Sequence, residues 1–228
     1  MLSVDLSNYS GPVSQDQARD LFNAGVRKAI VQLVRPDINL HREQIPALVG
    51  TGIDVEAYVY VWYSAGEQFI RDRVAWACRE AADFPQIKFI WADCEQADDT
   101  GFDYLHADQQ YVVNMTRAAI DTIGAFGYQT GIYTARWWWI PATGDSAYFS
   151  GVFPLWNANY DHDPDIDQVN YGGWSVPKME QFHGSTTFAG VPMVDLNSYV
   201  VAETIRPAAA DPRLTQARDL LSAVLEGR

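Results

Sequence analysis

The sequence predicts an α/β fold: a flattened (β/α) TIM-like barrel in which some helices of the second half are missing. Apolar runs of strand length alternate with amphipathic helical stretches, which is typical of parallel βα units rather than of a sandwich. About eight such runs fall within roughly 200 residues, which suits a compact barrel. The later runs lack convincing helices between them, so we expect the barrel to be incomplete on that side.

The elements follow from local signals along the chain. Ser14 and Gln17 form a capping box that opens the first helix, and Gly25 closes it. We expect segments 136–150 and 161–177 to be irregular. The predicted strands are Leu2–Leu6, Lys28–Val34, Ile53–Tyr63, Ile87–Cys94, Gln129–Thr134, Phe153–Ala158, Lys178–Phe182 and Pro192–Tyr199. The predicted helices are Gln15–Ala24, His41–Val49, Glu67–Asp83 and Ala107–Phe126.

Residues 1–205 are therefore predicted to form one catalytic barrel. Residues 206–228 are expected to form a linker, Arg206–Asp211, and a final helix, Leu214–Leu225, which either packs on the barrel or leads to a further module. The sequence has no internal repeat and no low-complexity segment.

Composition narrows the possible partners. Hydrophobic residues make up 48% of the 228 residues and charged residues 20%, as in a globular protein with an ample core. The net charge of −13 argues against nucleic acid, whose binding relies on Lys and Arg. No apolar run approaches the roughly 18–20 residues of a membrane span, and no signal peptide is visible. We expect a monomer without membrane contact, cofactor or metal.

The strongest candidate for chemistry is a pair of carboxylates at the end of one strand. The run IKFIWADCE ends with Asp93 and Glu95, and strand side chains alternate, so these two point the same way. In βα barrels the active site lies at the carboxyl ends of the strands. A second D-x-E pair, Asp54 and Glu56, opens its strand and therefore belongs at the opposite end of the barrel.

Two further acids fall at comparable places. Asp5 ends the first strand and Asp195 lies in the last, and these strands are neighbours if the barrel closes. The four carboxylates would then ring one mouth, where mutual repulsion keeps at least one pKa raised. A glycosidase needs such a group, because its general acid must hold a proton near neutral pH.

Blocks of sequence in a fixed order carry a family resemblance. VDLSNYSG, AYVYVWYS, FIWADCE, TGIYT, PLWNANYD, MEQF and VDLN run from about Val4 to Tyr199. In this the chain resembles the glycoside hydrolases of family 25, the Chalaropsis-type lysozymes or N-acetylmuramidases. The resemblance implies cleavage of the β-1,4 bond between N-acetylmuramic acid and N-acetylglucosamine in bacterial peptidoglycan.

The resemblance also implies roles for particular residues. Glu95 would be the general acid, and Asp93 would stabilise the positive charge on an oxocarbenium or oxazolinium-like species. Asp5 and Asp195 would tune and position these two. The sugar cleft would be lined by Tyr58, Tyr133, Trp156 and Gln181.

Several features depart from the family or fit it less directly. Cys94 stands inside the D-x-E motif and is expected to face the helix layer. Cys78, on the preceding helix, could approach Cys94, but we expect both to be free thiols. Val59 stands where many members have His.

Of Trp137–Trp139, at most one or two can face the cleft, because consecutive residues point in different directions. The loop 161–167 is expected to be an exposed acidic loop rather than a calcium site.

Two other functions stay open at this level. One is a non-catalytic barrel that binds glycans or serves as a phage structural component; the other is a same-fold glycosidase acting on another N-acetylated glycan such as chitin. In the favoured interpretation the protein acts on the wall outside the cell, delivered by an export signal absent from this sequence or by phage lysis.

Overall fold

Eight strands close into a barrel, as the sequence predicts. The computed structural model describes residues 1–33, 39–96 and 101–200. The strands follow chain order around the barrel, and each pairs with the next. They are β1 (Leu2–Leu6), β2 (Lys28–Gln32), β3 (Asp54–Tyr60), β4 (Phe89–Asp93), β5 (Gln129–Thr134), β6 (Leu155–Ala158), β7 (Met179–Phe188) and β8 (Val191–Tyr199).

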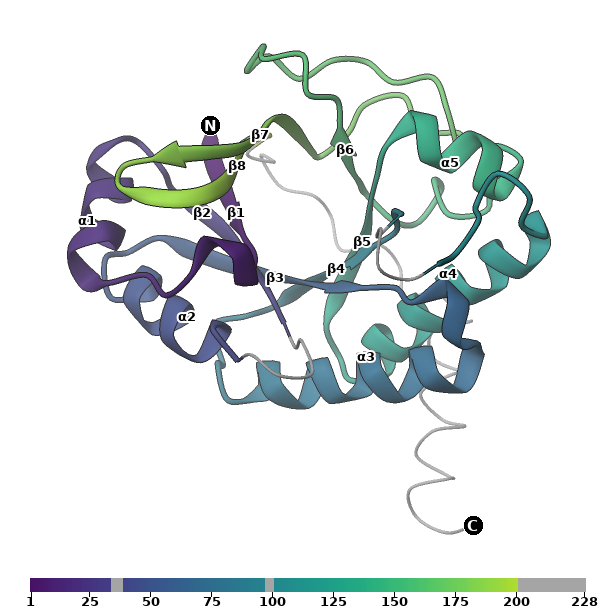
Figure 1. Cartoon of the computed structure of the whole chain (residues 1–228), viewed down its shortest axis with the longest axis horizontal. Helices are drawn as coiled ribbons and strands as arrows, with labels where there is room; N and C mark the ends of the chain where they lie inside the picture. Colours follow the sequence, from purple (N-terminus) through teal and green to yellow (C-terminus); the bar gives the residue numbers. More distant parts are fainter. Residues whose placement is uncertain (34–38, 97–100, 201–228) are drawn as a thin grey trace, which may run out of the picture.

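Five α-helices lie outside these strands in the described part of the chain (Figure 1). They are α1 (Gln15–Asn23), α2 (His41–Val49), α3 (Glu67–Ala82), α4 (Gln109–Ala125) and α5 (Arg136–Thr143), with short 3₁₀ turns η1 (Asn8–Ser10) and η2 (Tyr63–Ala65). The capping box of Ser14 and Gln17 is present at the start of α1. None of the described helices has the length and apolar character needed to cross a bilayer.

The second half lacks helices as predicted, although its last strand runs in an unexpected direction. Neither the β6–β7 connection nor the β7–β8 connection contains a helix. Strands β2 to β7 each run parallel to the strand before them, whereas β8 is antiparallel to both β7 and β1. Strand β8 thus departs from the parallel βα pattern, because no crossover helix precedes it and a tight hairpin reverses the chain.

The hairpin of β7 and β8 is also longer than expected. Strand β7 continues to Phe188 through polar residues that carry no apolar pattern, and Ala189 and Gly190 make the turn with φ of 49° and 76°. Positive φ at both positions matches the twist of a two-residue hairpin. The tip reaches α1, where the Gln17 amide donates to the carbonyl of Gly190 at 2.8 Å (Figure 1).

Helix α5 corrects a second expectation. Segment 136–150 is predicted to be irregular, yet Arg136–Thr143 is helical despite Pro141 and the lack of a side-chain cap. Trp138 and Trp139 are fully buried, whereas Trp137 is 54% exposed. Burial of two indoles, each removing a large apolar area from water, outweighs the weak local propensity. Trp137 is therefore the one indole of the three that is accessible at the surface.

Two apolar layers hold the barrel together. The outer layer fills the space between strands and helices and includes Cys78 and Cys94. The inner layer is largely aromatic, formed by Ile30, Tyr58, Phe89, Trp91, Tyr133, Ala135, Trp156, Ala158 and Met179. The inner layer forms a solid floor beneath the barrel mouth.

Gly131 is needed where the inner layer is tightest. A Cβ at this position of β5 would lie 2.5 Å from Cζ3 of Trp91 and 2.7 Å from the carbonyl oxygen of Pro154. We expect Gly131→Ala to lower the free energy of unfolding by about 1–3 kcal/mol through overpacking. Denaturant unfolding measures this. Gly151→Ala is the control, because its Cβ would meet no atom within 4 Å; equal midpoints for the two variants would contradict the prediction.

Candidate active site

Strand β4 delivers Asp93 to the centre of the barrel mouth. Its neighbours in register are Tyr60 of β3 and Tyr133 of β5. Asp93 is only 5% exposed, and its Oδ1 atom accepts no hydrogen bond. Burial, followed by the nearby charges of Glu95 and Asp5, raises the pKa of Asp93 well above its ordinary value. A buried carboxyl oxygen without a donor at this place is suited to receive one from a ligand.

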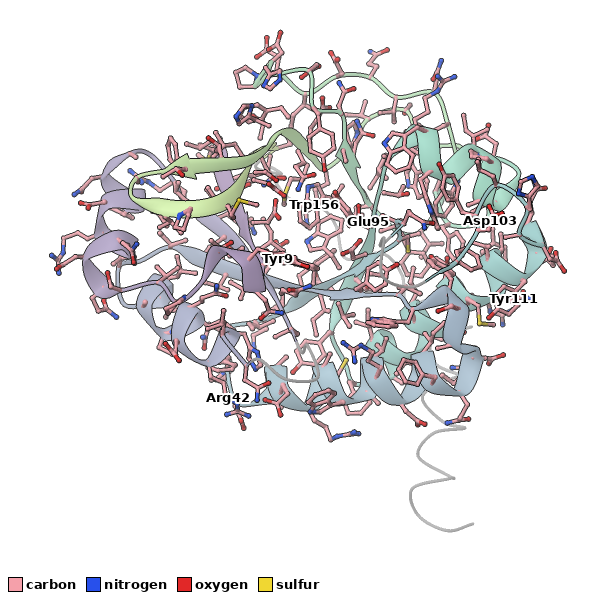
Figure 2. The ribbon with its side chains drawn as sticks, viewed as in Figure 1. Tyr9, Arg42, Glu95, Asp103, Tyr111 and Trp156 are labelled. Carbon is pink, nitrogen blue, oxygen red and sulfur yellow. The ribbon has the colours of Figure 1, made fainter. Side chains whose placement is uncertain are left out.

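Glu95 lies two residues further along, past the end of β4. It is half-buried, and its backbone carbonyl accepts a hydrogen bond from the Tyr60 hydroxyl at 3.1 Å. In the view of Figure 2, Glu95 and Trp156 lie near the middle of the barrel, while Arg42 lies at its outer edge. The Glu95 side chain is thus more exposed than that of Asp93, although Asp93 ends β4 and Glu95 follows it by only two residues.

Asp5 and Asp195 face each other directly across the pairing of β1 with β8. The Gln181 side chain bridges them, donating to Oδ2 of Asp5 at 2.9 Å and to Oδ2 of Asp195 at 3.1 Å. Burial raises the pKa of both carboxyls, and the charge of Asp195 raises that of Asp5 further. The two acids are therefore held as a positioned pair rather than as free surface groups.

Printed contacts bring the acids of three strands together. Tyr133, the register partner of Asp93, donates to Gln181, and Gln181 donates to both Asp5 and Asp195. Burial raises the pKa of Tyr58, and the charges of all four acids raise it further, in keeping with this arrangement. The expectation that clustering raises at least one carboxyl pKa agrees with the raised values at Asp5, Asp93 and Asp195.

The four residues predicted to line the sugar cleft are all buried. Tyr58, Tyr133, Trp156 and Gln181 are all at most 7% exposed. Trp156 packs against the rings of Tyr58, Trp91 and Tyr133 at centroid distances of 6.2, 5.7 and 4.5 Å. With 2% of its surface exposed, Trp156 has no open face on which a sugar ring could stack. The Tyr133 hydroxyl donates to Gln181 at 2.8 Å and so fixes the amide that bridges the acids.

Sequence reasoning missed two residues of this site. Asn197 donates to Oδ2 of Asp5 at 2.9 Å and accepts from the Trp156 indole at 2.7 Å. The alternation of Asp195 and Asn197 in VDLN was the available signal, since both point to one face of β8. Tyr160 follows β6, lies with its hydroxyl 3.3 Å from that of Tyr133, and is 43% exposed. No strand pattern marks Tyr160, because it lies beyond the strand in a positive-φ conformation.

The second D-x-E pair lies where the sequence places it, at the start of β3 and away from the mouth. The ammonium group of Lys28 bonds to Asp54 at 2.7 Å and to Glu56. The indole of Trp91 donates to the other oxygen of Glu56 at 2.7 Å. Glu56 is thus a paired charge beneath the aromatic floor, and a structural role accounts for it.

Cys78 and Cys94 are both buried free thiols, as expected, and burial raises the pKa of each to about 12.

Three carboxylates meet beside the acidic loop. Oxygens of Asp161 and Asp167, in the loop, and of Glu180, on β7, lie within 4.8 Å of one another. The sequence did not associate Glu180 with this loop.

The amide of Asn159 donates to these three carboxylates, to Asp161 at 2.7 Å, Glu180 at 3.1 Å and Asp167 at 3.5 Å. A neutral donor therefore holds the cluster together. The three carboxylates are thus linked to one another through a single amide group.

Comparisons with known proteins agree with this geometry. The sequence profile described as "Glycosyl hydrolases family 25" matches residues 4–191. A Dictyostelium discoideum relative named "Probable GH family 25 lysozyme 3" is 30% identical over 202 residues, covering 85% of this chain and 40% of that protein. "Counting factor 50" of the same organism is 33% identical over 117 residues, 50% of this chain and 36% of that one. The chain thus spans about 40% or less of the length of these two relatives.

Solved structures share the fold. The bacterial lysozyme from Streptomyces coelicolor superposes with a TM-score of 0.72 at 16% identity, covering 96% of this chain and 97% of that one. The muramidase from Acremonium alcalophilum gives a TM-score of 0.70 at 19% identity, covering 96% and 99%. At such low identity the likeness concerns the course of the backbone.

Proposed function

Because the chain belongs to the glycosyl hydrolases of family 25, we propose that it is a muramidase that cuts the β-1,4 bond between N-acetylmuramic acid and N-acetylglucosamine in peptidoglycan. The observation that carries the proposal is the convergence of Asp5, Asp93, Glu95 and Asp195 on one mouth. A module that only binds glycans gains nothing from four carboxylates that repel one another. A hydrolase uses them to hold a proton in place.

Glu95 is the proposed general acid. It is the more accessible of the two β4 carboxyls, and it lies where a glycosidic oxygen can approach from the mouth. Mutual repulsion among the acids keeps protons within the set near neutral pH. As the bond from the anomeric carbon to the leaving oxygen breaks, the Glu95 proton passes to that oxygen. A water then adds to the anomeric carbon and returns a proton to Glu95.

Asp93 is the proposed stabiliser of the positive charge. Its Oδ1 atom, buried and without a donor, is free to accept the N–H of the substrate acetamido group. In that position Asp93 serves an oxazolinium ion formed by attack of the acetamido oxygen, and it serves an oxocarbenium ion equally. Gln181 donates to both Asp5 and Asp195, and Asn197 donates to Asp5. Held in this way on β1 and β8, the two acids add fixed negative charge next to Asp93 and Glu95.

Substrate and location follow from the same proposal. The partner is bacterial peptidoglycan, and the protein acts outside the cell on the wall, reached by export or by phage lysis. A monomer suffices, because all four acids come from one chain.

Product analysis tests the function. We expect digests of purified peptidoglycan to contain, by mass spectrometry, fragments that end in reducing N-acetylmuramic acid. Fragments ending in reducing N-acetylglucosamine would refute the bond assignment. Binding of wall fragments with no new reducing ends would favour the non-catalytic barrel, and faster release from chitin than from peptidoglycan would favour another N-acetylated glycan as the substrate.

A further inference from the structure

A cavity opens beside the carboxylates, between α5 and the segment after β6. Its volume is about 520 Å³, within the usual range of small-ligand pockets. Arg136 and Trp137 come directly after β5, and Asn159 and Tyr160 directly after β6. Both are carboxyl ends of parallel strands, so this pocket opens at the same end of the barrel as Asp93. In Figure 1, α5 lies next to the green loops that lead from β6 to β7.

The pocket adjoins the carboxylate site through Tyr160. This residue lines the pocket, and its hydroxyl lies 3.3 Å from that of Tyr133, which in turn bonds to Gln181. Tyr160 is also close enough to Glu95 and Asp195 to sense both charges. A ligand bound at the carboxylates can therefore extend past Tyr160 into the pocket without leaving the surface.

The walls of the pocket combine one cation with one exposed ring. Arg136 is exposed and makes no hydrogen bond or ion pair with any residue in the described part of the chain. Trp137 is 54% exposed and is held by Tyr104, whose ring lies 6.0 Å away at 70°. Among the lining residues the single acid is Asp167, which accepts from Asn159 at 3.5 Å and whose backbone N–H donates to Glu180.

An unpaired guanidinium is notable in a chain that carries 16 basic and 29 acidic residues. Its planar fork matches the geometry of a carboxylate, which it can bind through two parallel hydrogen bonds. The neighbouring indole offers a flat apolar surface. The pocket therefore suits an anionic ligand that has an apolar part next to its carboxylate.

The substrate of the proposed muramidase carries such a group. N-acetylmuramic acid bears a peptide stem on its lactyl ether, and this stem combines free carboxylates with small apolar side chains beside the bond that is cut. We propose that the pocket binds the peptide stem, with a stem carboxylate on Arg136 and apolar stem atoms against Trp137; this rests on the proposed function. The pocket thus recognises peptide-bearing glycan, while the carboxylate site recognises the sugars.

Calorimetry with two soluble fragments tests the proposal without turnover. One fragment is the disaccharide ending in N-acetylmuramic acid with its stem, and the other is the same disaccharide without it. We expect the stem to tighten binding to the unaltered protein by about 10- to 100-fold, the range for a hydrogen bond to a charged group. Arg136→Gln should lose most of that gain, and Arg136→Lys should keep part of it, because the ammonium retains charge without the fork.

Arg19→Gln is the matched control. Arg19 lies on α1, is exposed and pairs with Asp16, so its loss changes net charge equally while leaving the pocket intact. Equal affinity for the two fragments, or a gain that survives in Arg136→Gln, would overturn the stem site. Neither result touches the muramidase proposal, which depends on the products of digestion and is refuted separately by them.

Discussion

Replacing Glu95 with Gln is expected to lower the rate of peptidoglycan hydrolysis by about 100- to 10,000-fold, the usual contribution of a positioned general acid. Glutamine keeps the shape and hydrogen-bonding capacity of the side chain but has no proton to give to the leaving oxygen. The release of new reducing ends from purified peptidoglycan measures the effect. Thermal unfolding should stay close to that of the unaltered protein, since Glu95 is only half-buried.

Asp54→Asn is a demanding control for this experiment. Asp54 belongs to the other D-x-E pair, is exposed, and lies at the start of β3 beside Lys28. The same type of change there should leave the rate within about twofold of the original, since Asp54 lies at the opposite end of the barrel from the mouth. Hydrolysis by Glu95→Gln at the original rate would remove Glu95 from the mechanism.

Replacing Asp93 with Asn is expected to lower the rate by about 100- to 1,000-fold, as for loss of one preorganised electrostatic group. The amide has the same shape but no negative charge with which to stabilise a cationic sugar. The same substitution should stabilise the fold at neutral pH, because burial and the charges of Glu95 and Asp5 oppose ionisation of Asp93. Activity and stability are thus expected to move in opposite directions.

The pH dependence of unfolding separates this effect from a packing change. The pKa of Asp93 is raised in the folded state, so its contribution to stability is fully present below the unfolded value near 3.8. That contribution is lost as pH rises through the folded-state pKa. Denaturant unfolding from pH 4 to 8 should therefore show stability falling less steeply in Asp93→Asn than in the unaltered protein.

Asp72→Asn, an exposed change on α3, should leave the original slope in place. Parallel pH profiles for Asp93→Asn and the unaltered protein would contradict the raised pKa. A flatter profile without loss of activity would separate Asp93 from catalysis.

The place of Asp93 was predictable because its signal is local: it ends an apolar run, and that run forms strand β4. Glu95 follows two residues later, beyond the end of the strand, so strand alternation does not fix the direction of its side chain. The pairing of Asp5 with Asp195 needed one further step, the closure of the barrel, which the number of strands indicated. Their assigned roles stay predictions until the variants above are measured.

Other features depend on packing between distant segments, which a sequence pattern does not carry. Helix α5 forms around Pro141 because Trp138 and Trp139 are buried by residues from other parts of the chain. The polar end of β7 is a strand because β8 supplies hydrogen bonds along its length. The cavity beside Tyr160 arises where helix α5 meets the segment that follows β6. The expected linker and helix at 206–228 lie outside the described residues.

The closure of the barrel by β1 and β8 has a consequence for biosynthesis. Asp5 and Asp195 are 190 positions apart in the chain, yet they are direct partners across one pair of strands. Translation supplies Asp5, Asp93 and Glu95 long before the residues of β8, which bring Asp195 and Asn197. A nascent chain that has not yet emerged as far as β8 holds an open barrel and an incomplete set of acids. Contacts between such distant segments also form slowly in folding. On the proposed function, every partial product of the ribosome lacks part of the acid set, which is complete only in the closed molecule.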